Sequence, residues 1–291
     1  MRPVLFQLPT PFGSFPVSSF GVFLLLAFIV AIVLTRTRTR RLGWDSGEVV
    51  DLSLYAIIGG IIGARIGYVL VNWQDFVLAP ARITMIWVDA GLMFYGALIG
   101  GALVAWAYGR RRGWSLGQIA DAAAPGLAVG YAIAMIGALF YGLNYGRPAH
   151  VAWAVVLFGE PRHPTQLYLM VAALVVFGIL LALDRGIRTA GRLFWQFVLL
   201  LAIARFAIEY FMDSPRVLGP LTLAQLASVV AVVLSAIMWV ALGHAPAAAP
   251  GSGPRPEAGP VVPQSDGEPH GKTDHRLPPS EQNAQAENCH E

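Results

Sequence analysis

Long runs of apolar residues constrain this 291-residue chain more than any other feature of its sequence. Each run is close to the roughly 20 residues that an α-helix needs to cross the hydrocarbon core of a bilayer. The runs fall at about 18–35, 53–72, 90–108, 119–141, 165–183, 193–211 and 220–242. We therefore predict an all-α polytopic membrane protein with about seven transmembrane helices.

Composition divides the chain into two regions. Only 13% of its residues are charged, whereas soluble domains carry about 25%. Residues 1–243 contain 17 arginines and 10 acidic residues, whereas residues 244–291 contain 3 basic and 7 acidic residues. We predict a membrane-embedded domain over 1–243 and a disordered, acidic tail rich in Pro, Gly and Ala over 244–291.

The positions of the arginines predict the orientation in the membrane. Arginines gather in alternate predicted loops, at 36–41, 110–112 and 185–192. Cytoplasmic loops are the ones enriched in basic residues. With seven spans, the N-terminus then lies outside and the tail lies in the cytoplasm.

Glycines recur at four-residue spacing inside several of the runs. Because glycine has no side chain, this spacing lets helix backbones approach closely. We expect packing seams, and no chemistry, at Gly59, Gly63, Gly67, Gly96, Gly100, Gly126 and Gly130.

Several functional classes are disfavoured because the sequence lacks their characteristic residues or motifs. No basic patch is interleaved with aromatic residues, so no nucleic-acid partner is expected. Cys289 is the single cysteine, and His150 and His163 do not have metal-ligand spacing. Phosphate-binding, dinucleotide-binding and zinc-protease motifs are not found. We therefore predict neither a metal site nor a cofactor.

Two arginines fall inside predicted spans, where a charge needs a partner or a function. Arg65 and Arg205 each lie 12 residues after the start of a span that begins on the cytoplasmic side. At the rise of an α-helix, both reach roughly 18 Å into the bilayer. They are therefore expected at one depth, in the outer half.

Further polar residues approach this depth from the outer side. Tyr95 lies about one turn into the third span, Arg147 follows the fourth, and His163 and Gln166 open the fifth. We predict a polar, cationic cavity that is open to the outer leaflet. Guanidinium groups bind phosphate through paired hydrogen bonds, so a phospholipid headgroup is the expected anion.

A purely structural alternative exists for both arginines in the spans. Glu209 follows Arg205 by one turn, and such a pair can neutralise itself. Arg65 can extend toward the interface or donate hydrogen bonds to backbone carbonyls of a neighbouring helix.

At these residues the chain resembles the prolipoprotein diacylglyceryl transferases of bacterial inner membranes. The resemblance extends over about 15–216, and its most specific stretch is Arg162–Tyr168, with the sequence RHPTQLY. The other similar stretches are Gly63–Tyr68, Phe94–Gly101, Asp121 with Pro125, Tyr145–Pro148, and Arg205–Phe206 with Glu209.

The resemblance implies a function, partners and a site. Members of that family transfer a diacylglyceryl group from phosphatidylglycerol to the lipobox cysteine thiol of a prolipoprotein signal peptide. The reaction is the first step of lipoprotein maturation and takes place at the outer face of the inner membrane. The implied catalytic residues are Tyr95 and His163, and the implied phospholipid-binding residues are Arg65, Arg147, Arg205, Gln166 and Glu209.

The chain differs from the family pattern at several polar positions. Tyr95-Gly96-Ala97 stands where the family usually has His-Gly-Gly. Apolar or aromatic residues replace further polar residues of the family signature at Met135, Ala138, Tyr141 and Leu143, and Phe20 and Leu201 replace tyrosines.

These differences leave two interpretations open. In the first, the protein is a divergent transferase in which Tyr95, Tyr141 or His163 makes the polar contact of the missing histidine. In the second, it is an inactive relative that binds phospholipid or lipoprotein precursors. A small transporter is a weaker alternative, because the runs show no inverted repeat.

Overall fold

The computed structural model describes residues 3–10, 13–41, 43–77, 79–84, 91–184 and 189–243. The predicted tail over 244–291, together with Arg185 and Arg188, lies outside the described residues.

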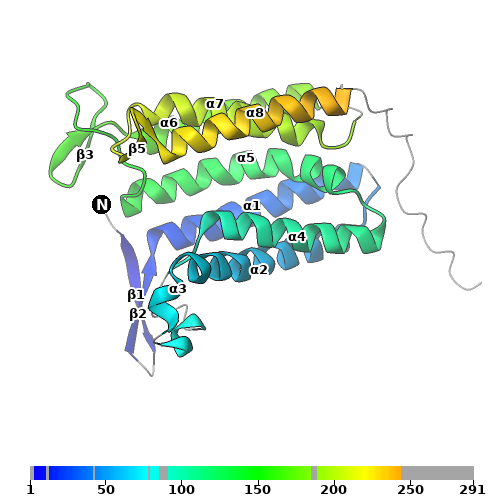
Figure 1. Ribbon diagram of the computed structural model, residues 1–291, viewed down its shortest axis with the longest axis horizontal. Coiled ribbons are helices and arrows are strands. Elements are labelled where there is room, and N and C mark those ends of the chain that lie inside the picture. The colour runs from blue at the N-terminus through cyan, green and yellow to red at the C-terminus, as the bar shows by residue number, and fades with distance from the viewer. Residues whose placement is uncertain are drawn as a thin grey trace, which may run out of the picture. The chain divides into compact units, whose positions relative to one another are not determined.

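Within the described residues, every predicted apolar run forms a helix (Figure 1). These helices are α1 (Ser19–Arg41), α2 (Ser46–Val71), α4 (Phe94–Arg112), α5 (Leu116–Tyr141), α6 (Thr165–Leu183), α7 (Arg192–Glu209) and α8 (Leu223–Gly243). Two short helices, α3 (Trp73–Val77) and η1 (Pro80–Ile83), follow α2. Three antiparallel hairpins join β1 (Val4–Thr10) to β2 (Gly13–Ser18), β3 (Val155–Leu157) to β4 (Glu160–Arg162), and β5 (Arg216–Leu218) to β6 (Leu221–Thr222).

Five helices among the described residues are long and apolar enough to cross a membrane. They are α1, α2, α5, α6 and α8. The other two long helices are among the shortest and include charged residues within that length, because the 19-residue α4 ends in Arg110–Arg112 and the 18-residue α7 contains Arg192, Arg205 and Glu209. The described residues are therefore mostly helical, which is consistent with the predicted all-α membrane protein, and include five candidate spans.

Two groups of arginines were predicted in loops, and this prediction is wrong. Residues 36–41 form the last turns of α1, and residues 110–112 form the last turn of α4. Basic side chains are favourable at a helix C-terminus because of the partial negative charge there. Arg38 also forms an ion pair with Asp184, which ties the end of α1 to the end of α6.

Local capping explains where several helices begin and end. The side chain of Asp45 accepts hydrogen bonds from the backbone at the start of α2. Ser115 and Gln118 form a reciprocal capping box at the start of α5. Gly113 and Gly142 end α4 and α5 in the left-handed conformation, which glycine adopts without steric cost.

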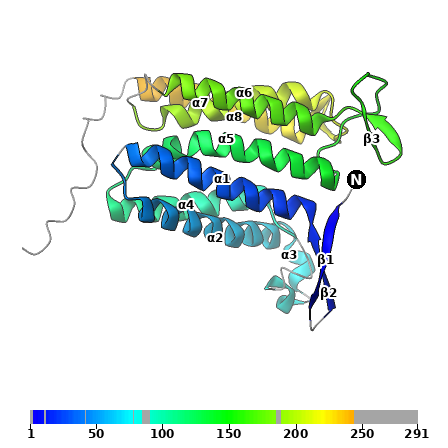
Figure 2. The same ribbon diagram turned by 180° about the vertical axis from the view of Figure 1, so that it is seen from behind.

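The long helices lie in layers. Figures 1 and 2 show α1 and α5 between the α2–α4 pair on one side and α6, α7 and α8 on the other. The most extensive contacts join α2 to α4, α1 to α5, α7 to α8 and α5 to α6. Half of the apolar window of α5 is buried, against 11% of that of α1, so α5 is the central helix.

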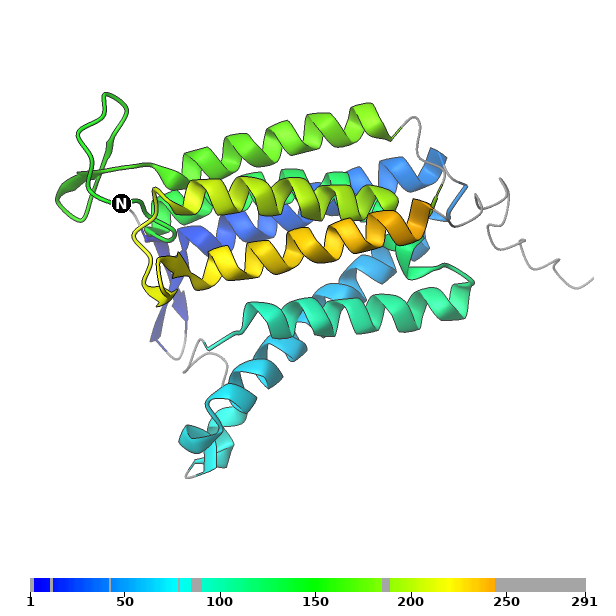
Figure 3. The ribbon, with the colours of Figure 1, turned by 45° about the horizontal axis from the view of Figure 1, so that its top comes forward.

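The α2–α4 pair packs through glycines, as the four-residue spacing predicted. A Cβ atom on Gly63 or Gly96 would overlap the carbonyl oxygen of the other residue. Figure 3 shows the resulting oblique crossing of the two helices. Between the two middle helices, α1 and α5, a Cβ on Gly126 would come within 2.6 Å of the Ala31 carbonyl oxygen. The glycine seams are thus confirmed as close backbone contacts.

Candidate functional site

The segment around Arg147 pairs with two other segments at one end of the helices. The Gly146 amide donates to the His163 carbonyl at 3.1 Å, and the His163 amide donates to the Arg147 carbonyl at 3.1 Å. On the other side, the Arg147 amide donates to the Phe211 carbonyl at 2.9 Å. A Cβ on Gly146 would lie 2.9 Å from that carbonyl oxygen and 2.6 Å from the His163 Cβ, so only glycine fits here.

Arg147 and Arg205 converge on Met212, which is buried. Nε of Arg147 donates to the Met212 carbonyl at 3.0 Å, and Nη1 of Arg205 contacts the Met212 Sδ atom. Among the described residues, no hydrogen-bond partner is found for Nη1 or Nη2 of Arg147, or for Nε or Nη2 of Arg205. Two guanidinium groups near one residue thus retain donors for an anion.

Arg205 is held by a chain of polar contacts that ends on α8. Its Nη1 atom lies 2.8 Å from Oε2 of Glu209, one turn away on α7. Oε1 of Glu209 accepts a 2.9 Å hydrogen bond from the Thr222 hydroxyl. Thr222 and Gln225 exchange hydrogen bonds of 3.0 and 3.2 Å between side chain and backbone. These two residues therefore form the capping box of α8.

His163 lies among several aromatic side chains beside the Arg147 segment. Its Nδ1 atom lies 3.1 Å from the Tyr168 hydroxyl, which accepts a 2.6 Å hydrogen bond from Nε1 of Trp153. The imidazole also packs edge-on against the ring of Phe211, with 5.2 Å between centroids. No partner of the imidazole Nε2 atom is found in the part of the chain that the structure describes.

Gln166 is fully buried at the start of α6. Its Nε2 atom donates to the Leu143 carbonyl at 2.7 Å, while its Oε1 atom is buried without a partner among the described residues. The neighbouring Thr165 hydroxyl donates to the Asn144 carbonyl. Both side chains therefore fix the loop that leads from α5 to Arg147.

Arg162 is already paired, in contrast to Arg147. Its guanidinium donates to Asp213 and to Glu160, both at 2.9 Å. The hydrogen bond to Asp213 raises the pKa of the Arg162 guanidinium, and the charge of Glu160 acts in the same direction. Nη1 of Arg162 also donates to the Gly146 carbonyl at 3.3 Å, whereas its Nε atom is buried without a partner among the described residues.

Arg65, on α2, has a separate set of partners in the segment between α2 and α4. Its side chain is buried and donates to the carbonyl groups of Ile83 at 2.8 Å, Arg82 at 2.5 Å and Gly91 at 3.1 Å. The guanidinium also lies 5.4 Å from the ring centroid of Phe76. These contacts match the structural alternative for Arg65, in which the guanidinium bonds backbone carbonyls. Phospholipid contact by Arg65 stays a prediction.

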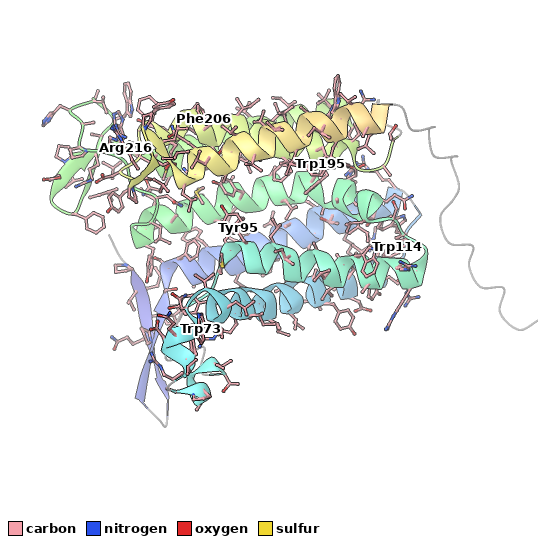
Figure 4. All side chains as sticks on the ribbon, in the orientation of Figure 1. Trp73, Tyr95, Trp114, Trp195, Phe206 and Arg216 are labelled. Atoms are coloured by element: carbon pink, nitrogen blue, oxygen red, sulfur yellow. The ribbon has the colours of Figure 1, made fainter. Side chains whose placement is uncertain are left out.

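Tyr95 lies in the first turn of α4 and is 46% exposed. Figure 4 shows Tyr95 toward the same end of the helices as Phe206 and Arg216, whereas Trp114 and Trp195 lie toward the opposite end. The Met93 amide, just before α4, donates to the Ala64 carbonyl at 3.0 Å. Arg65 and Tyr95 thus belong to the α2–α4 pair, whereas the contacts of Arg147, His163 and Arg205 come from α5 to α8 and their loops.

Some residues of this arrangement were not singled out from the sequence. Met212 and Trp153 were assigned no role in the site, and Tyr168 was noted only as the end of the RHPTQLY stretch. Thr222 and Gln225 carry a recognisable sequence signal, because a threonine followed three residues later by glutamine, just before an apolar run, is a helix-start pattern.

The arrangement can bind an anion beside a group that accepts protons. Guanidinium donors in a site partly screened from water stabilise negative charge more strongly than they would in bulk water. Histidine is the side chain that most often transfers protons near neutral pH. Within the described residues, no group of three or more His, Cys, Asp or Glu side chains could hold a metal ion.

Comparison with known proteins gives a consistent result. Residues 3–241 match the family model described as prolipoprotein diacylglyceryl transferase. A phosphatidylglycerol–prolipoprotein diacylglyceryl transferase of Nostoc sp. is 30% identical, over 81% of this chain and 91% of the relative. The enzymes with the same name from Geobacter sulfurreducens and Aromatoleum aromaticum are 32% and 34% identical, over 78% and 72% of this chain and 89% and 84% of their own lengths.

The matched residues include six of the long helices in full and α8 except its last two residues, and with them Arg147, His163 and Arg205. The chain therefore belongs to the prolipoprotein diacylglyceryl transferase family.

Proposed function

We propose that this protein transfers the diacylglyceryl group of phosphatidylglycerol to the lipobox cysteine thiol of a prolipoprotein signal peptide. Membership of the family and the names of its relatives support this activity. One observation supports assigning this activity to particular residues. Arg147 and Arg205 both contact Met212, and each keeps guanidinium donors that have no partner among the described residues.

The two arginines would bind the phosphate of phosphatidylglycerol. In the reaction, a bond forms between the cysteine sulfur and the diacylglyceryl carbon, while the bond from that carbon to the phosphate oxygen breaks. Glycerol phosphate leaves with the electron pair of the broken bond. Negative charge therefore grows on the phosphate, where the free Nη groups of Arg147 and Arg205 can stabilise it.

His163 is the group we propose to take the thiol proton, because the thiolate is the nucleophile. Nε2 accepts a proton only if Nδ1 carries the hydrogen and donates it to the Tyr168 hydroxyl oxygen. That oxygen has two acceptor positions, of which one receives the Trp153 Nε1–H. The 3.1 Å contact between Nδ1 and Tyr168 is compatible with this tautomer.

The remaining predicted residues take supporting roles in this proposal. Gln166 and Glu209 are almost fully buried, so they would position the α5–α6 loop and Arg205 rather than meet lipid. Arg65 would hold the backbone that leads to Tyr95, because its donors bind carbonyls on that path. Tyr95 would contact substrate from α4, since nearly half of its surface is exposed.

We further propose a seven-span topology in the bacterial inner membrane. Helices α4 and α7 have 19 and 18 residues, which supports their crossing the bilayer together with the five more apolar helices. Arginines at the ends of α1 and α4 support a cytoplasmic location for those ends. The N-terminus, the hairpins and the Arg147–Arg205 cluster would then face the outer leaflet, and the tail over 244–291 would be cytoplasmic.

The proposed activity is tested with purified protein in nanodiscs that contain phosphatidylglycerol. A lipobox peptide and its Cys-to-Ser variant are added in parallel. Release of glycerol phosphate and the mass of the peptide are followed together. We expect release only with the cysteine peptide, accompanied by the mass gain of one diacylglyceryl group.

Replacement of His163 by glutamine separates the chemical step from binding. We expect His163→Gln to lower kcat by about 10²–10⁴-fold, the usual contribution of a positioned acid or base. No turnover by the wild-type protein, under conditions where another family member is active, would contradict the proposal and favour an inactive lipid-binding relative.

A further inference from the structure

A cavity lies between α6, α7 and α8, away from the Arg147–Arg205 cluster. Its volume is about 230 Å³, and its lining includes Leu183, Trp195, Leu199 and Trp239. Ligand pockets for drug-sized molecules usually have volumes of about 300–1,000 Å³. The cavity therefore suits part of a molecule, and its apolar lining suits a stretch of hydrocarbon chain.

Two polar atoms, one in the lining of this cavity and one beside it, are buried without a partner among the described residues. One is Oε1 of Gln196, which lines the cavity, and the other is Nε of Arg192. The Arg192 guanidinium lies 5.4 Å from the ring centroid of Trp239, which also lines the cavity. Because buried polar groups in native proteins are nearly always hydrogen-bonded, both atoms point to a ligand that is polar at one end.

Going deeper along α7, a charged, a polar and then apolar side chains follow each other. The phosphate, the ester groups and the acyl chains of a phospholipid have the same order. Arg192 is the first residue of α7, and Gln196 follows one turn deeper. Trp195 and Trp239 flank them, and tryptophan is enriched at the level of lipid headgroups. The cavity thus has a cation beside the end where α7 begins, an amide in its lining next to that end and apolar side chains beyond.

We propose that the cavity of α6, α7 and α8 binds an anionic phospholipid. The phosphate contacts the guanidinium of Arg192, and part of one acyl chain fills the space beside Leu183 and Leu199. Rotation of the Gln196 amide by about 180° presents its N–H groups to an ester carbonyl of the lipid. Under the proposed orientation this lipid belongs to the cytoplasmic leaflet, whose anionic lipids are attracted by basic residues.

The proposal is tested by site-specific photo-crosslinking to lipid. Benzoylphenylalanine replaces Leu183, which lines the cavity and is 38% exposed, so the larger side chain has room. The matched control carries the same group in place of Val233, which is 51% exposed on α8 and does not line the cavity. Both proteins are irradiated in nanodiscs of equal parts phosphatidylglycerol and phosphatidylcholine, and the crosslinked lipids are identified by mass spectrometry.

We expect several-fold enrichment of phosphatidylglycerol over phosphatidylcholine at Leu183 and a ratio near that of the bilayer at Val233. Arg192→Gln should remove the enrichment. Arg110→Gln should retain it, because Arg110 likewise lies 5.4 Å from a tryptophan ring centroid, that of Trp106, but belongs to α4.

Three results would overturn the proposal. They are equal ratios at the two crosslinking positions, enrichment that survives Arg192→Gln, and loss of enrichment in excess free glycerol phosphate. The last result would assign the site to a soluble anion. Because the readout is lipid identity and not turnover, the outcome is independent of whether the protein acts as a transferase.

Discussion

The hydroxyl of Thr222 donates a 2.9 Å hydrogen bond to Oε1 of Glu209. The other oxygen of this carboxylate lies 2.8 Å from Nη1 of Arg205. Glu209 is only 1% exposed, so both of its oxygens depend on protein partners. The start of α8 therefore sets the position of an arginine on α7.

Thr222→Val should lower both stability and turnover. The substitution keeps the side-chain shape but leaves the buried Oε1 of Glu209 without a donor, at a cost of about 1–3 kcal/mol. We expect a lower apparent Tm and a lower kcat, with a smaller change in KM. Thr222→Ser retains the hydroxyl and should restore kcat. If Thr222→Ser and Thr222→Val had the same kcat, the hydrogen bond to Glu209 would not position Arg205.

Arg147→Gln and Arg205→Gln should each lower kcat/KM by about 10²–10³-fold. The estimate is the usual cost of removing one donor that stabilises charge in a transition state. Turnover of phosphatidylglycerol in nanodiscs measures the effect. Arg216→Gln is the control, because Arg216 is exposed at the same end of the helices (Figure 4). Equal losses in all three variants would indicate a general requirement for positive charge.

Arg65→Lys should act mainly on stability. Lysine keeps the charge, but its single ammonium group cannot follow the fork of donors that reaches Ile83, Arg82 and Gly91. We expect a lower apparent Tm in detergent, with residual activity in the folded fraction. Unchanged Tm together with lost turnover would instead assign Arg65 to phospholipid binding.

Gly63→Ala and Gly178→Ala should change stability in opposite directions. A Cβ on Gly63 would overlap the Gly96 carbonyl oxygen and lie 2.8 Å from the Gly100 Cα, so α2 and α4 must separate. A Cβ on Gly178 meets nothing within 4 Å, and alanine is favoured over glycine in a helix by about 1 kcal/mol. Thermal unfolding of the two variants measures the difference. A stable Gly63→Ala protein would contradict the close packing of this seam.

The proposed orientation predicts where a fused reporter is active. A fluorescent protein that folds only in the cytoplasm, joined after residue 243, should be bright. Alkaline phosphatase, which is active only outside, should be inactive at the same position. The reverse pattern would overturn the orientation and with it the leaflet assigned to each site.

The apolar runs were sufficient to predict the seven long helices, but not the short helices α3 and η1. The predicted run over 165–183 coincides with α6, and α8 starts three residues after the predicted 220. Hydropathy did not predict the ends of helices that continue beyond the apolar stretch, as α1 does through Arg36–Arg41. The hairpins were not predicted, because their strands, of two to seven residues, do not produce long apolar runs.

Less of the candidate site could be predicted, because its contacts join distant segments. Arg65 and Arg205 were both predicted at the same depth, but depth does not determine which loop meets each side chain. The carbonyl partners of Arg65 lie 17 to 26 residues along the chain, and Nε of Arg147 reaches Met212 over 65 residues. In contrast, the pairing of Arg205 with Glu209 is local to one helix and could be read from their spacing.

The charges on α7 also determine how this helix can enter the bilayer. An isolated arginine or acidic residue near the centre of a helix costs about 2.5–3.5 kcal/mol during insertion. Glu209 offsets Arg205 within α7, but the second oxygen of Glu209 finds its partner only in Thr222, at the start of α8. During synthesis, α7 leaves the ribosome before that partner exists. The two helices are therefore expected to pass from the translocon into lipid together, as one helical hairpin.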